Sequence, residues 1–438
     1  MKKLNYKKTV IVGIGKTGIS CVNFLYSKNI NFKVIDHDFS PKFANLLPKN
    51  TSFHFGSINE KWILESTLII ISPGIKKDIY IFKYMKSIGV DVISDIELFL
   101  RYINKPIVAI TGSNGKSTVT SLVGKILKNY GLNVKVGGNI GIPVLDLISK
   151  DVDIYLLEIS SFQLEYTYNL NPIISTILNV KNIHIDRYPL GIKEYRKIKL
   201  KVYGKNTTCI VNEEDNMTKP NKKFNYISFG YNKGDYSCRV FKKNVWLSFK
   251  KKLLLNCRSM KMSGKHNYLN SLTALSISDV LRVPYNVSLK TIKDFKGLPY
   301  RQELIKTYDK VLWINDSKST NIYSTISALN SFKIKRKIHL ILGGEGRFAN
   351  FGLLKKFVNI KKSYIYCYGK DGNIISSFFK KNCFLTKNLE NVFYILKKKI
   401  KKKDIVLFSP ACASTDQFEN FEKRGKKFSS LVNSYKKN

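Results

Sequence analysis

The chain lacks long hydrophobic runs and paired cysteines. No stretch reaches the ~18 consecutive apolar residues of a transmembrane helix, so we expect no membrane span. The seven cysteines are scattered and include no C-x-x-C pair, which argues against a zinc site or a disulfide framework. This cysteine usage fits a reducing cytoplasm. We also expect a monomer.

Acidic residues are also scarce. The 438 residues include 31 Asp and Glu against 75 Lys and Arg, which gives a formal net charge of +44 at pH 7. Such an excess is typical of proteins that neutralise nucleic-acid phosphates, and a nucleic-acid-stimulated ATPase is one alternative. Most of the lysines are dispersed as singles and pairs, however, and Ile and Asn are abundant too. We therefore attribute the charge to a general drift in composition and expect no specific nucleic-acid partner.

Short apolar runs rich in β-branched residues alternate with helical patterns along the whole chain. Examples are TVIVG near the N-terminus, PIVAIT and IYLLE in the middle, and KIHLILGG and DIVLFSP near the C-terminus. The alternation predicts parallel sheets covered by helices, the α/β class. The chain is too long for one hydrophobic core, so we expect three domains, at residues 1–93, 94–298 and 299–438.

Three glycines follow the first apolar run. Gly13, Gly15 and Gly18 form G-x-G-x-x-G at the start of a helical pattern, and Asp36 ends the next apolar run. In a Rossmann-like domain these glycines let the backbone approach a pyrophosphate, and the acid contacts a ribose. The pattern predicts a nucleotide diphosphate but does not identify it. An NAD enzyme and plain tight packing both remain alternatives.

A second glycine-rich turn, TGSNGKST, follows the run PIVAI and precedes an amphipathic helical pattern. It has two residues between its glycines where the usual phosphate loop, G-x-x-x-x-G-K-[ST], has four. We still predict a phosphate site, because a lysine at a helix N-terminus is unfavourable unless an anion is present. Lys116 would reach the β- and γ-phosphates, and Ser117 or Thr118 would bind Mg²⁺. The candidate ATP-binding residues in this loop are Gly112, Ser113, Asn114, Gly115, Lys116, Ser117 and Thr118.

Two further side chains are candidates at the same sheet edge. Glu158 ends the run DIYLLE, where the metal-binding carboxylate of an ATPase would point toward the phosphate loop. His184 follows the run IISTILN, and the alternative reading of it is an ordinary loop histidine. Lys199 lies in a helical pattern, EYRKIKLKVY, but composition does not distinguish it from the other lysines.

These motifs together resemble the Mur ligase family over essentially the whole chain. The resemblance rests on AITGSNGKST, LEISSFQLE, GKHNYLNSLTAL, GLPYRQE, INDSKSTN, ILGGEGR and SPACASTDQFENFEKRG. In that family the shortened phosphate loop is the normal form. The folylpolyglutamate synthases share this loop and also join glutamate. The N-terminal glycine pattern and the SPACAS–DQF segment favour the Mur ligases over them.

The resemblance implies an ATP-dependent amide ligase of peptidoglycan precursor synthesis, which adds D-glutamate to UDP-N-acetylmuramoyl-L-alanine through an acyl phosphate. It implies a Rossmann-like N-terminal domain that binds the UDP-sugar and a central ATPase-type parallel sheet. It also implies a Rossmann-like C-terminal domain that binds D-glutamate and closes on ATP. Two Mg²⁺ ions are expected, one at Ser117 and Glu158 and one near His184. Lys199 is expected to carry a carbamate that acts as a metal ligand.

Further site residues follow from the same resemblance. The implied catalytic residues are Lys116, Glu158, His184 and Lys199. The implied UDP-sugar contacts are Thr17, Asp36, Ser72, Pro73, Gly74 and Asn139. The additional ATP contacts are Asn270, Arg301 and Asp316, with His266 and Asn267 beside them. The implied D-glutamate contacts are Lys318, Thr320, Arg347, Ser414 and Phe421.

Four positions depart from the family pattern. Arg347 stands where a lysine is expected, and the two are not equivalent, because guanidinium is larger and binds carboxylates bidentately. Tyr300 replaces a histidine, Ile183 replaces an acid, and Asp38 lies where a basic residue is expected near the diphosphate. We expect these departures to affect catalytic efficiency and substrate affinity rather than the reaction.

Overall fold

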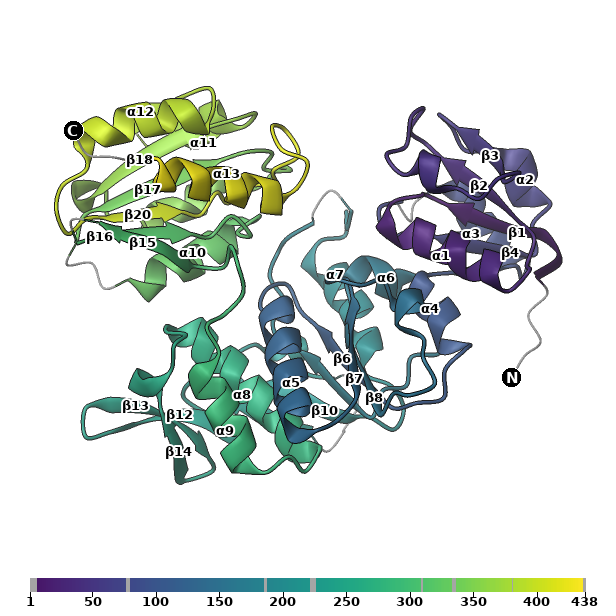
Figure 1. Cartoon of the computed structure of the whole chain (residues 1–438), viewed down its shortest axis with the longest axis horizontal. Coiled ribbons are helices and arrows are strands. Elements are labelled where there is room, and N and C mark those ends of the chain that lie inside the picture. The colour runs from purple at the N-terminus through teal and green to yellow at the C-terminus, as the bar shows by residue number, and fades with distance from the viewer. Residues whose placement is uncertain are drawn as a thin grey trace. The chain divides into compact units, whose positions relative to one another are not determined.

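Helices and strands alternate along the chain, and the strands form three sheets in the computed structural model (Figure 1). The structure describes residues 6–75, 79–184, 187–220, 226–308, 310–332, 336–379 and 381–435. The chain divides into two compact units. The first comprises Met1–Val180, Arg187–Ser259 and Leu269–Lys293. The second comprises Lys181–Asp186, Met260–Tyr268 and Asp294–Asn438. Among the described residues, no helix is long and apolar enough to cross a membrane.

The N-terminal sheet is parallel, with strand order β3-β2-β1-β4-β5. Its elements are β1 Thr9–Val12, α1 Lys16–Ser27, β2 Phe32–Asp36, β3 Ser52–Phe55, α2 Glu60–Leu64, β4 Leu68–Ile71, α3 Tyr80–Ser87 and β5 Asp91–Ile93. Strands β1 and β4 are buried at every position, as expected of central strands covered on both faces. Because parallel strands share a direction, the segments after β1, β2 and β4 meet at one edge.

The central sheet has nine strands in the order β14-β13-β12-β11-β10-β9-β6-β8-β7. Its parallel part and the helices along it are α4 Asp95–Leu100, β6 Ile107–Thr111, α5 Lys116–Tyr130, β7 Val134–Gly138, β8 Ile154–Glu158, α6 Ser161–Glu165, β9 Ile174–Ile177, α7 Ile192–Lys199, β10 Thr208–Asn212, β11 Tyr226–Gly230, α8 Lys265–Val280 and α9 Tyr285–Asp294. Strand β6 lies between β8 and β9, which places the phosphate loop beside the end of β8.

An antiparallel meander extends this sheet, and the sequence did not predict it. Its strands are β12 Tyr236–Phe241, β13 Asn244–Phe249 and β14 Lys252–Asn256. Two-residue hairpin turns need positive φ and usually contain Asn-Gly or Asp-Gly. Here Lys242 and Lys243 adopt φ values of 46° and 61°, so the usual sequence signal of a hairpin is missing.

The C-terminal sheet has the order β15-β16-β20-β17-β18-β19, and only β15 runs antiparallel to its neighbour. Its elements are β15 Glu303–Tyr308, β16 Val311–Asn315, α10 Ile322–Ser331, β17 Ile338–Gly343, β18 Ser363–Tyr368, α11 Gly372–Ser377, β19 Cys383–Leu385, α12 Leu389–Lys399, β20 Ile405–Phe408 and α13 Phe421–Asn433. Short 3₁₀ helices along the chain are Tyr6–Lys8, Ala44–Leu46, Val144–Leu147, Leu200–Val202, Asn216–Thr218, Cys257–Ser259, Phe351–Lys356 and Ile360–Lys362.

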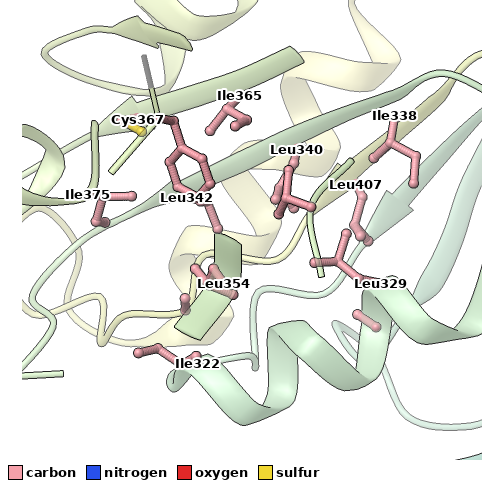
Figure 2. Packing of buried hydrophobic residues seen from close by; sticks show 14 of the residues in the cluster. Ile322, Leu329, Ile338, Leu340, Leu342, Leu354, Ile365, Cys367, Ile375 and Leu407 are labelled. Carbon is pink, nitrogen blue, oxygen red and sulfur yellow. The ribbon is translucent and has the colours of Figure 1, made fainter. Parts of the chain in front are cut away.

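Both faces of the C-terminal sheet are covered. Leu340, Leu342 and Leu407 pack with α10 and α11 on one face, as Figure 2 shows. Ile341 and Val406, which alternate with them along the strands, pack with α12 and α13 on the other. This period-2 alternation is what a sheet buried on both faces requires. The predicted α/β class with three mainly parallel sheets is confirmed, and the domain boundaries at 93/94 and 298/299 stay predictions.

Candidate functional site

The shortened glycine loop between β6 and α5 is a compact turn that only glycine can form. Gly112 has a φ of 152°, and a Cβ there would lie 3.0 Å from Leu178 Cβ. Gly115 has a φ of 89°, and its Cβ would lie 2.7 Å from the side-chain oxygen of Asn270. The loop therefore ends at the N-terminus of α5, where backbone N–H groups favour an anion, with Asn270 facing it from α8.

Asn179, which the sequence reading missed, holds this loop in place. Its backbone carbonyl accepts the N–H of Ser113 at 2.9 Å, and its side-chain oxygen accepts that of Asn114 at 2.9 Å. Its Nδ2 donates back to the carbonyl of Asn114 at 3.0 Å. The backbone N–H groups of Ser113 and Asn114 are therefore both occupied by Asn179.

Lys116 is the first residue of α5 and bends back over the loop. Its ammonium donates to the carbonyls of Gly112 at 2.8 Å and Ser113 at 3.2 Å. A cation is disfavoured at a helix N-terminus, where the partial charge is positive. The position therefore fits a lysine that neutralises a bound anion, as the sequence predicts.

Glu158 ends β8 beside the loop, in register with Ile110 of β6. The residue is 1% exposed, and its Oε1 accepts from Asn139 Nδ2 at 2.7 Å. Its Oε2 is buried without a hydrogen-bond partner in the described part of the chain. An unpartnered buried carboxylate oxygen is costly, so this atom fits a site for a cation. Ser117, in the first turn of α5, is also buried.

Lys199 is buried behind the same loop, although the sequence gave no sign that separates it from surface lysines. It is 1% exposed, and its Nζ donates to Thr111 Oγ1 at 3.2 Å and to the carbonyl of Gly112 at 3.1 Å. Burial, followed by the nearby charge of Lys116, holds the pKa of Lys199 well below its usual range. The amine therefore has a strong tendency to be neutral.

Tyr195 is a second residue of this site that the sequence reading missed. It lies one turn before Lys199 on α7, and the Lys199 Nζ is 4.7 Å from the centre of its ring. Its hydroxyl accepts a hydrogen bond from Ser113 Oγ at 3.3 Å. Burial raises the pKa of Tyr195, so its hydroxyl stays protonated. The signal available in the sequence was the i, i+4 spacing of Tyr195 and Lys199, which places the two side chains on the same face of a helix.

His184 follows β9 and has a positive φ of 61°. It belongs to the segment Lys181–Asp186, which groups with the second compact unit, whereas Glu158 and Lys199 belong to the first. Its role as a metal ligand stays a prediction.

The N-terminal glycine pattern forms the expected tight turn. Gly13 has a φ of 87°, and a Cβ on Gly18 would lie 1.9 Å from the Gly13 carbonyl oxygen. Ser72 Oγ donates to that oxygen at 2.5 Å, and Asp36 Oδ2 accepts the N–H of Ile14 at 2.7 Å. Gly18 is therefore needed for packing, and Asp36 is held by the turn. The other UDP-sugar candidates near this edge are Thr17, Pro73 and Gly74.

Asp38, which replaces an expected basic residue, is adjacent to His37. The His37 Nε2 lies 3.3 Å from Asp38 Oδ1, and its Nδ1 lies 3.3 Å from Asp36 Oδ1. Both His37 and Asp38 are largely exposed, so water competes with these contacts.

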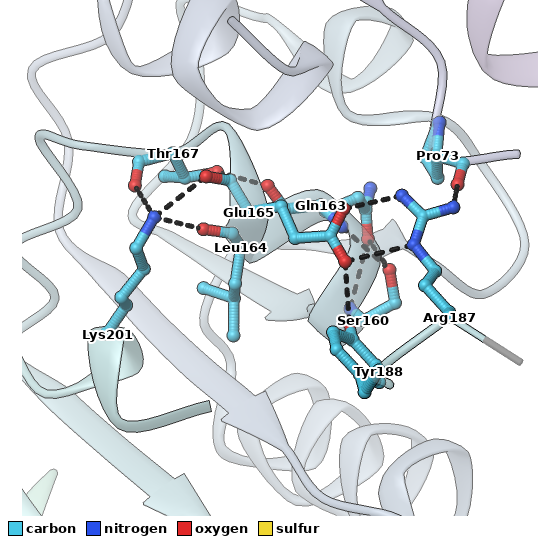
Figure 3. A network of polar contacts seen from close by, with 9 residues as sticks. All are labelled: Pro73, Ser160, Gln163, Leu164, Glu165, Thr167, Arg187, Tyr188 and Lys201. Carbon is cyan, nitrogen blue, oxygen red and sulfur yellow. Dashed lines mark hydrogen bonds and ion pairs between the residues drawn. The ribbon is translucent and has the colours of Figure 1, made fainter. Parts of the chain in front are cut away.

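A buried ion pair fixes the loop that carries Pro73 (Figure 3). Arg187 donates to both oxygens of Glu165, at 2.9 and 2.5 Å, and to the carbonyl of Pro73 at 3.0 Å. The Tyr188 hydroxyl donates to Glu165 Oε1 at 2.7 Å. Glu165 ends α6, which begins three residues after Glu158. The network therefore ties a candidate UDP-sugar loop to the helix that follows the candidate metal strand.

We expect Arg187→Met to lower the free energy of unfolding by about 3 kcal/mol, because it leaves the Glu165 carboxylate buried without its cation. Urea denaturation monitored by circular dichroism measures this. Lys427→Met is the matched control, since Lys427 and Glu390 form an ion pair of 2.6 Å whose side chains are 43% and 48% exposed. The control should lose less than about 1 kcal/mol. Equal losses of unfolding free energy in the two variants would contradict the assignment of Arg187 and Glu165 as a stabilising buried ion pair.

Among the ATP candidates of the C-terminal part, Asp316 is buried at the end of β16. Its carboxylate accepts from Ser319 Oγ at 2.5 Å, Ser409 Oγ at 2.7 Å and the N–H of Gln302 at 3.1 Å. Burial raises the pKa of Asp316 to about 6 despite these bonds. Arg301 lies close enough to lower this pKa somewhat. The carboxylate is therefore preorganised by three donors.

His266, at the start of α8, faces the same region. Its Nε2 lies 3.1 Å from the Gln302 side-chain amide, and its Nδ1 lies 3.5 Å from Ser331 Oγ. Burial, and then the charge of Arg301, lowers the pKa of His266 to about 4. The ring is neutral at physiological pH. Asn267, next to it, donates to the Ser263 carbonyl at 2.9 Å.

The D-glutamate candidates lie in loops of the C-terminal sheet, except Phe421, which is the first residue of α13. The Lys318 Nζ lies 3.6 Å from the centre of the Phe421 ring, a cation–π contact. Arg347 is exposed, with a φ of 50°, and Ser414 is buried in the loop after β20. Thr320 donates its N–H to the Lys318 carbonyl at 2.8 Å. That these residues bind D-glutamate stays a prediction.

Tyr300, where the family pattern has histidine, packs against a glycine. A Cβ on Gly425 of α13 would lie 2.4 Å from the Tyr300 ring. Gly425 therefore makes the room that the larger ring needs. Tyr300 has a φ of 62°, which is uncommon for an aromatic residue.

The chain is similar to known proteins over nearly its whole length. Residues 7–94 match the family model described as "Mur ligase MurD-like, N-terminal domain", and residues 110–278 match "Mur ligase middle domain". The chain is 46% identical to the UDP-N-acetylmuramoylalanine–D-glutamate ligase of Buchnera aphidicola subsp. Schizaphis graminum, with 97% of each chain covered. It is 43% identical to the ligase of the same name from Escherichia coli K12, covering 97% of this chain and 98% of the relative.

Solved structures share the fold. A MurF ligase from Thermotoga maritima in complex with ADP superimposes with a TM-score of 0.62 at 16% identity, covering 99% of each chain. A pseudomurein peptide ligase type C from Methanothermus fervidus gives a TM-score of 0.64 at 17% identity, covering 98% of this chain and 100% of the other.

Proposed function

The chain belongs to the Mur ligase family, and on that premise we propose that it is an ATP-dependent amide ligase that joins D-glutamate to UDP-N-acetylmuramoyl-L-alanine in peptidoglycan precursor synthesis. The observation that carries the proposal is the full-length similarity to ligases of that name. The geometry agrees with it, because Lys116, Glu158 and Lys199 surround one glycine loop at the N-terminus of α5.

The reaction must bring two anions together. The γ-phosphoryl group of ATP passes to the carboxylate of the alanyl end, which gives an acyl phosphate. The amine of D-glutamate attacks this carbonyl carbon, and the tetrahedral intermediate expels phosphate. Neutralising the negative charge of ATP and the carboxylate is therefore the main catalytic requirement. Lys116 supplies one positive charge at the end of the loop, and Asn270 faces the same loop.

The residues present fit Mg²⁺. Glu158 offers a buried carboxylate oxygen without a hydrogen-bond partner among the described residues, and Ser117 a hydroxyl at the start of α5. These two would hold one ion, and His184 with carbamylated Lys199 would provide ligands for a second. When bound, the ions supply positive charge that stabilises the transferring phosphoryl group.

Each predicted domain has one main role in this proposal, although Asn139 of the central domain is also an expected UDP-sugar contact and Arg301 and Asp316 of the C-terminal domain are also expected ATP contacts. Residues 1–93 bind the UDP-sugar with Thr17, Asp36 and the Ser72–Gly74 loop, while residues 94–298 bind ATP. Residues 299–438 bind D-glutamate with Lys318, Thr320, Arg347, Ser414 and Phe421. A cytoplasmic location and a monomeric state remain part of the proposal.

Phosphate release from ATP tests the function directly. We expect it to require both UDP-N-acetylmuramoyl-L-alanine and D-glutamate, and to give a product heavier than the nucleotide sugar by one glutamyl residue. Stimulation by DNA or RNA, without dependence on the amino acid, would instead support the ATPase alternative. Glutamate addition to a folate and not to the nucleotide sugar would favour the folylpolyglutamate synthase alternative.

Arg347 is the departure with the clearest test. We expect Arg347→Ala to raise the Michaelis constant for D-glutamate strongly and to leave that for ATP unchanged, because only D-glutamate loses a charged partner. Arg347→Lys, the residue of the family pattern, should be tolerated or should lower that constant. Steady-state kinetics with each substrate varied in turn measures both. If Arg347→Ala instead changed the Michaelis constant for ATP, the assignment of Arg347 to D-glutamate would be wrong.

A further inference from the structure

Two cysteines that are remote in the sequence lie side by side in the C-terminal sheet. Cys367 is on β18 and Cys383 begins β19, and their Sγ atoms are 3.7 Å apart. Both thiols are free, as are the other cysteines of the chain. The sequence indicates no such pair, because 15 residues and a helix separate the two positions.

The two thiols differ in solvent exposure and in pKa. Cys367 is fully buried, among the apolar side chains in Figure 2, whereas Cys383 is partly exposed. The hydrogen bond between the two thiols lowers the pKa of Cys383. The same hydrogen bond, together with burial, raises the pKa of Cys367. Reactivity toward oxidants follows thiolate character and access, and both favour Cys383.

We propose that Cys383 and Cys367 form a peroxide-sensitive thiol pair, in which Cys383 is oxidised first and Cys367 then closes a reversible disulfide. The Cys383 thiolate attacks hydrogen peroxide, the O–O bond breaks, and Cys383 sulfenic acid and hydroxide form. The Cys367 sulfur then attacks the Cys383 sulfur, the S–O bond breaks, and water leaves with the thiol proton. Two electrons pass from the two thiols to one peroxide.

The position of β19 allows the sulfurs to approach each other. A disulfide needs an S–S distance of about 2.05 Å, so the sulfurs must move closer than they are in the reduced protein. Strand β19 has three residues and is the terminal strand of the sheet, paired with β18 on one side. Strand β19 can therefore shift without breaking hydrogen bonds to a second neighbouring strand.

Hydrogen peroxide treatment of the purified full-length protein tests the proposal. We expect the intact mass to fall by two hydrogen atoms, peptide mapping to show a Cys367–Cys383 link, and dithiothreitol to restore both thiols. This measurement needs no substituted protein and does not depend on the ligase assay. A link between other cysteines, or peroxide consumption without any link, would overturn the proposal.

Substitutions distinguish the thiol that is oxidised first from the thiol that then closes the disulfide. In Cys367→Ser, the sulfenic acid at Cys383 has no resolving thiol, so dimedone should label Cys383. In Cys383→Ser, Cys367 should stay unlabelled, and labelling there would show that the order is wrong. Cys238→Ser is the matched control, because Cys238 is also partly exposed but lies in the central sheet, opposite Leu247. It should form the Cys367–Cys383 link as the unsubstituted protein does.

Discussion

Lys199→Ala is expected to be nearly inactive and to regain part of its activity in a buffer that contains a short carboxylic acid. The proposed role of Lys199 is that of a carbamate, an anion that helps to hold Mg²⁺. Removing it should lower turnover by roughly 10²-fold or more, the effect of losing one charged group that stabilises a transferring phosphoryl group. A small acid that enters the vacated space replaces the missing anion.

The surroundings of Lys199 favour this chemistry. A free ammonium at this position is disfavoured by burial and is repelled by the charge of Lys116. Burial and Lys116 already lower the pKa of Lys199, so its amine is available in the neutral form. The neutral amine adds CO₂ and loses a proton, which replaces a cation by an anion.

Lys197→Ala is the matched control for Lys199→Ala, because Lys197 is an exposed lysine on the same helix. It should keep full activity with and without the added acid. Activity is measured as phosphate release, and the carbamate itself by ¹³C nuclear magnetic resonance in ¹³CO₂-equilibrated buffer. Full activity of the unsubstituted enzyme after rigorous removal of bicarbonate, with no rescue of Lys199→Ala by any short acid, would refute the carbamate.

Lys116→Ala is the other substitution with a large expected effect. It should reduce turnover by roughly 10²-fold or more, because a contact to the transferring phosphoryl group contributes on the order of 3 kcal/mol in the transition state. Lys116 donates hydrogen bonds to the carbonyls of Gly112 and Ser113. Its removal should therefore lower kcat while the fold of the loop, which depends on glycine and Asn179, persists.

Lys125→Ala, on the same helix but exposed, is the control for Lys116→Ala and should behave like the unsubstituted enzyme. Steady-state kinetics with saturating D-glutamate and nucleotide sugar gives kcat and the Michaelis constant for ATP. Near-normal ligation by Lys116→Ala would rule out the loop as a catalytic phosphate site. A rise in the ATP constant alone would show that Lys116 binds ATP equally in the ground and transition states.

Local features of the fold were predictable from the sequence. The apolar runs became strands, and Gly112 and Gly115 gave the turn at the N-terminus of α5, because only glycine tolerates their φ values at such close contact. Glu158 was found because the last residue of a parallel strand lies at the edge where loops meet. The meander β12–β14 was missed because its first turn uses two lysines where a glycine is usual.

The sequence by itself determined the class of the fold, the position of the phosphate loop and the family, since each depends on residues close together in the chain or on recognisable motifs. The tertiary structure decided which of the many lysines is buried: Lys199 differs from Lys197 through its contacts with Thr111 and Gly112, which lie more than 80 residues away. It also decided that Cys367 meets Cys383 and that Arg187 meets Glu165. Burial, desolvation and the distance between charges are set by segments remote in the sequence, and composition and spacing do not contain that information.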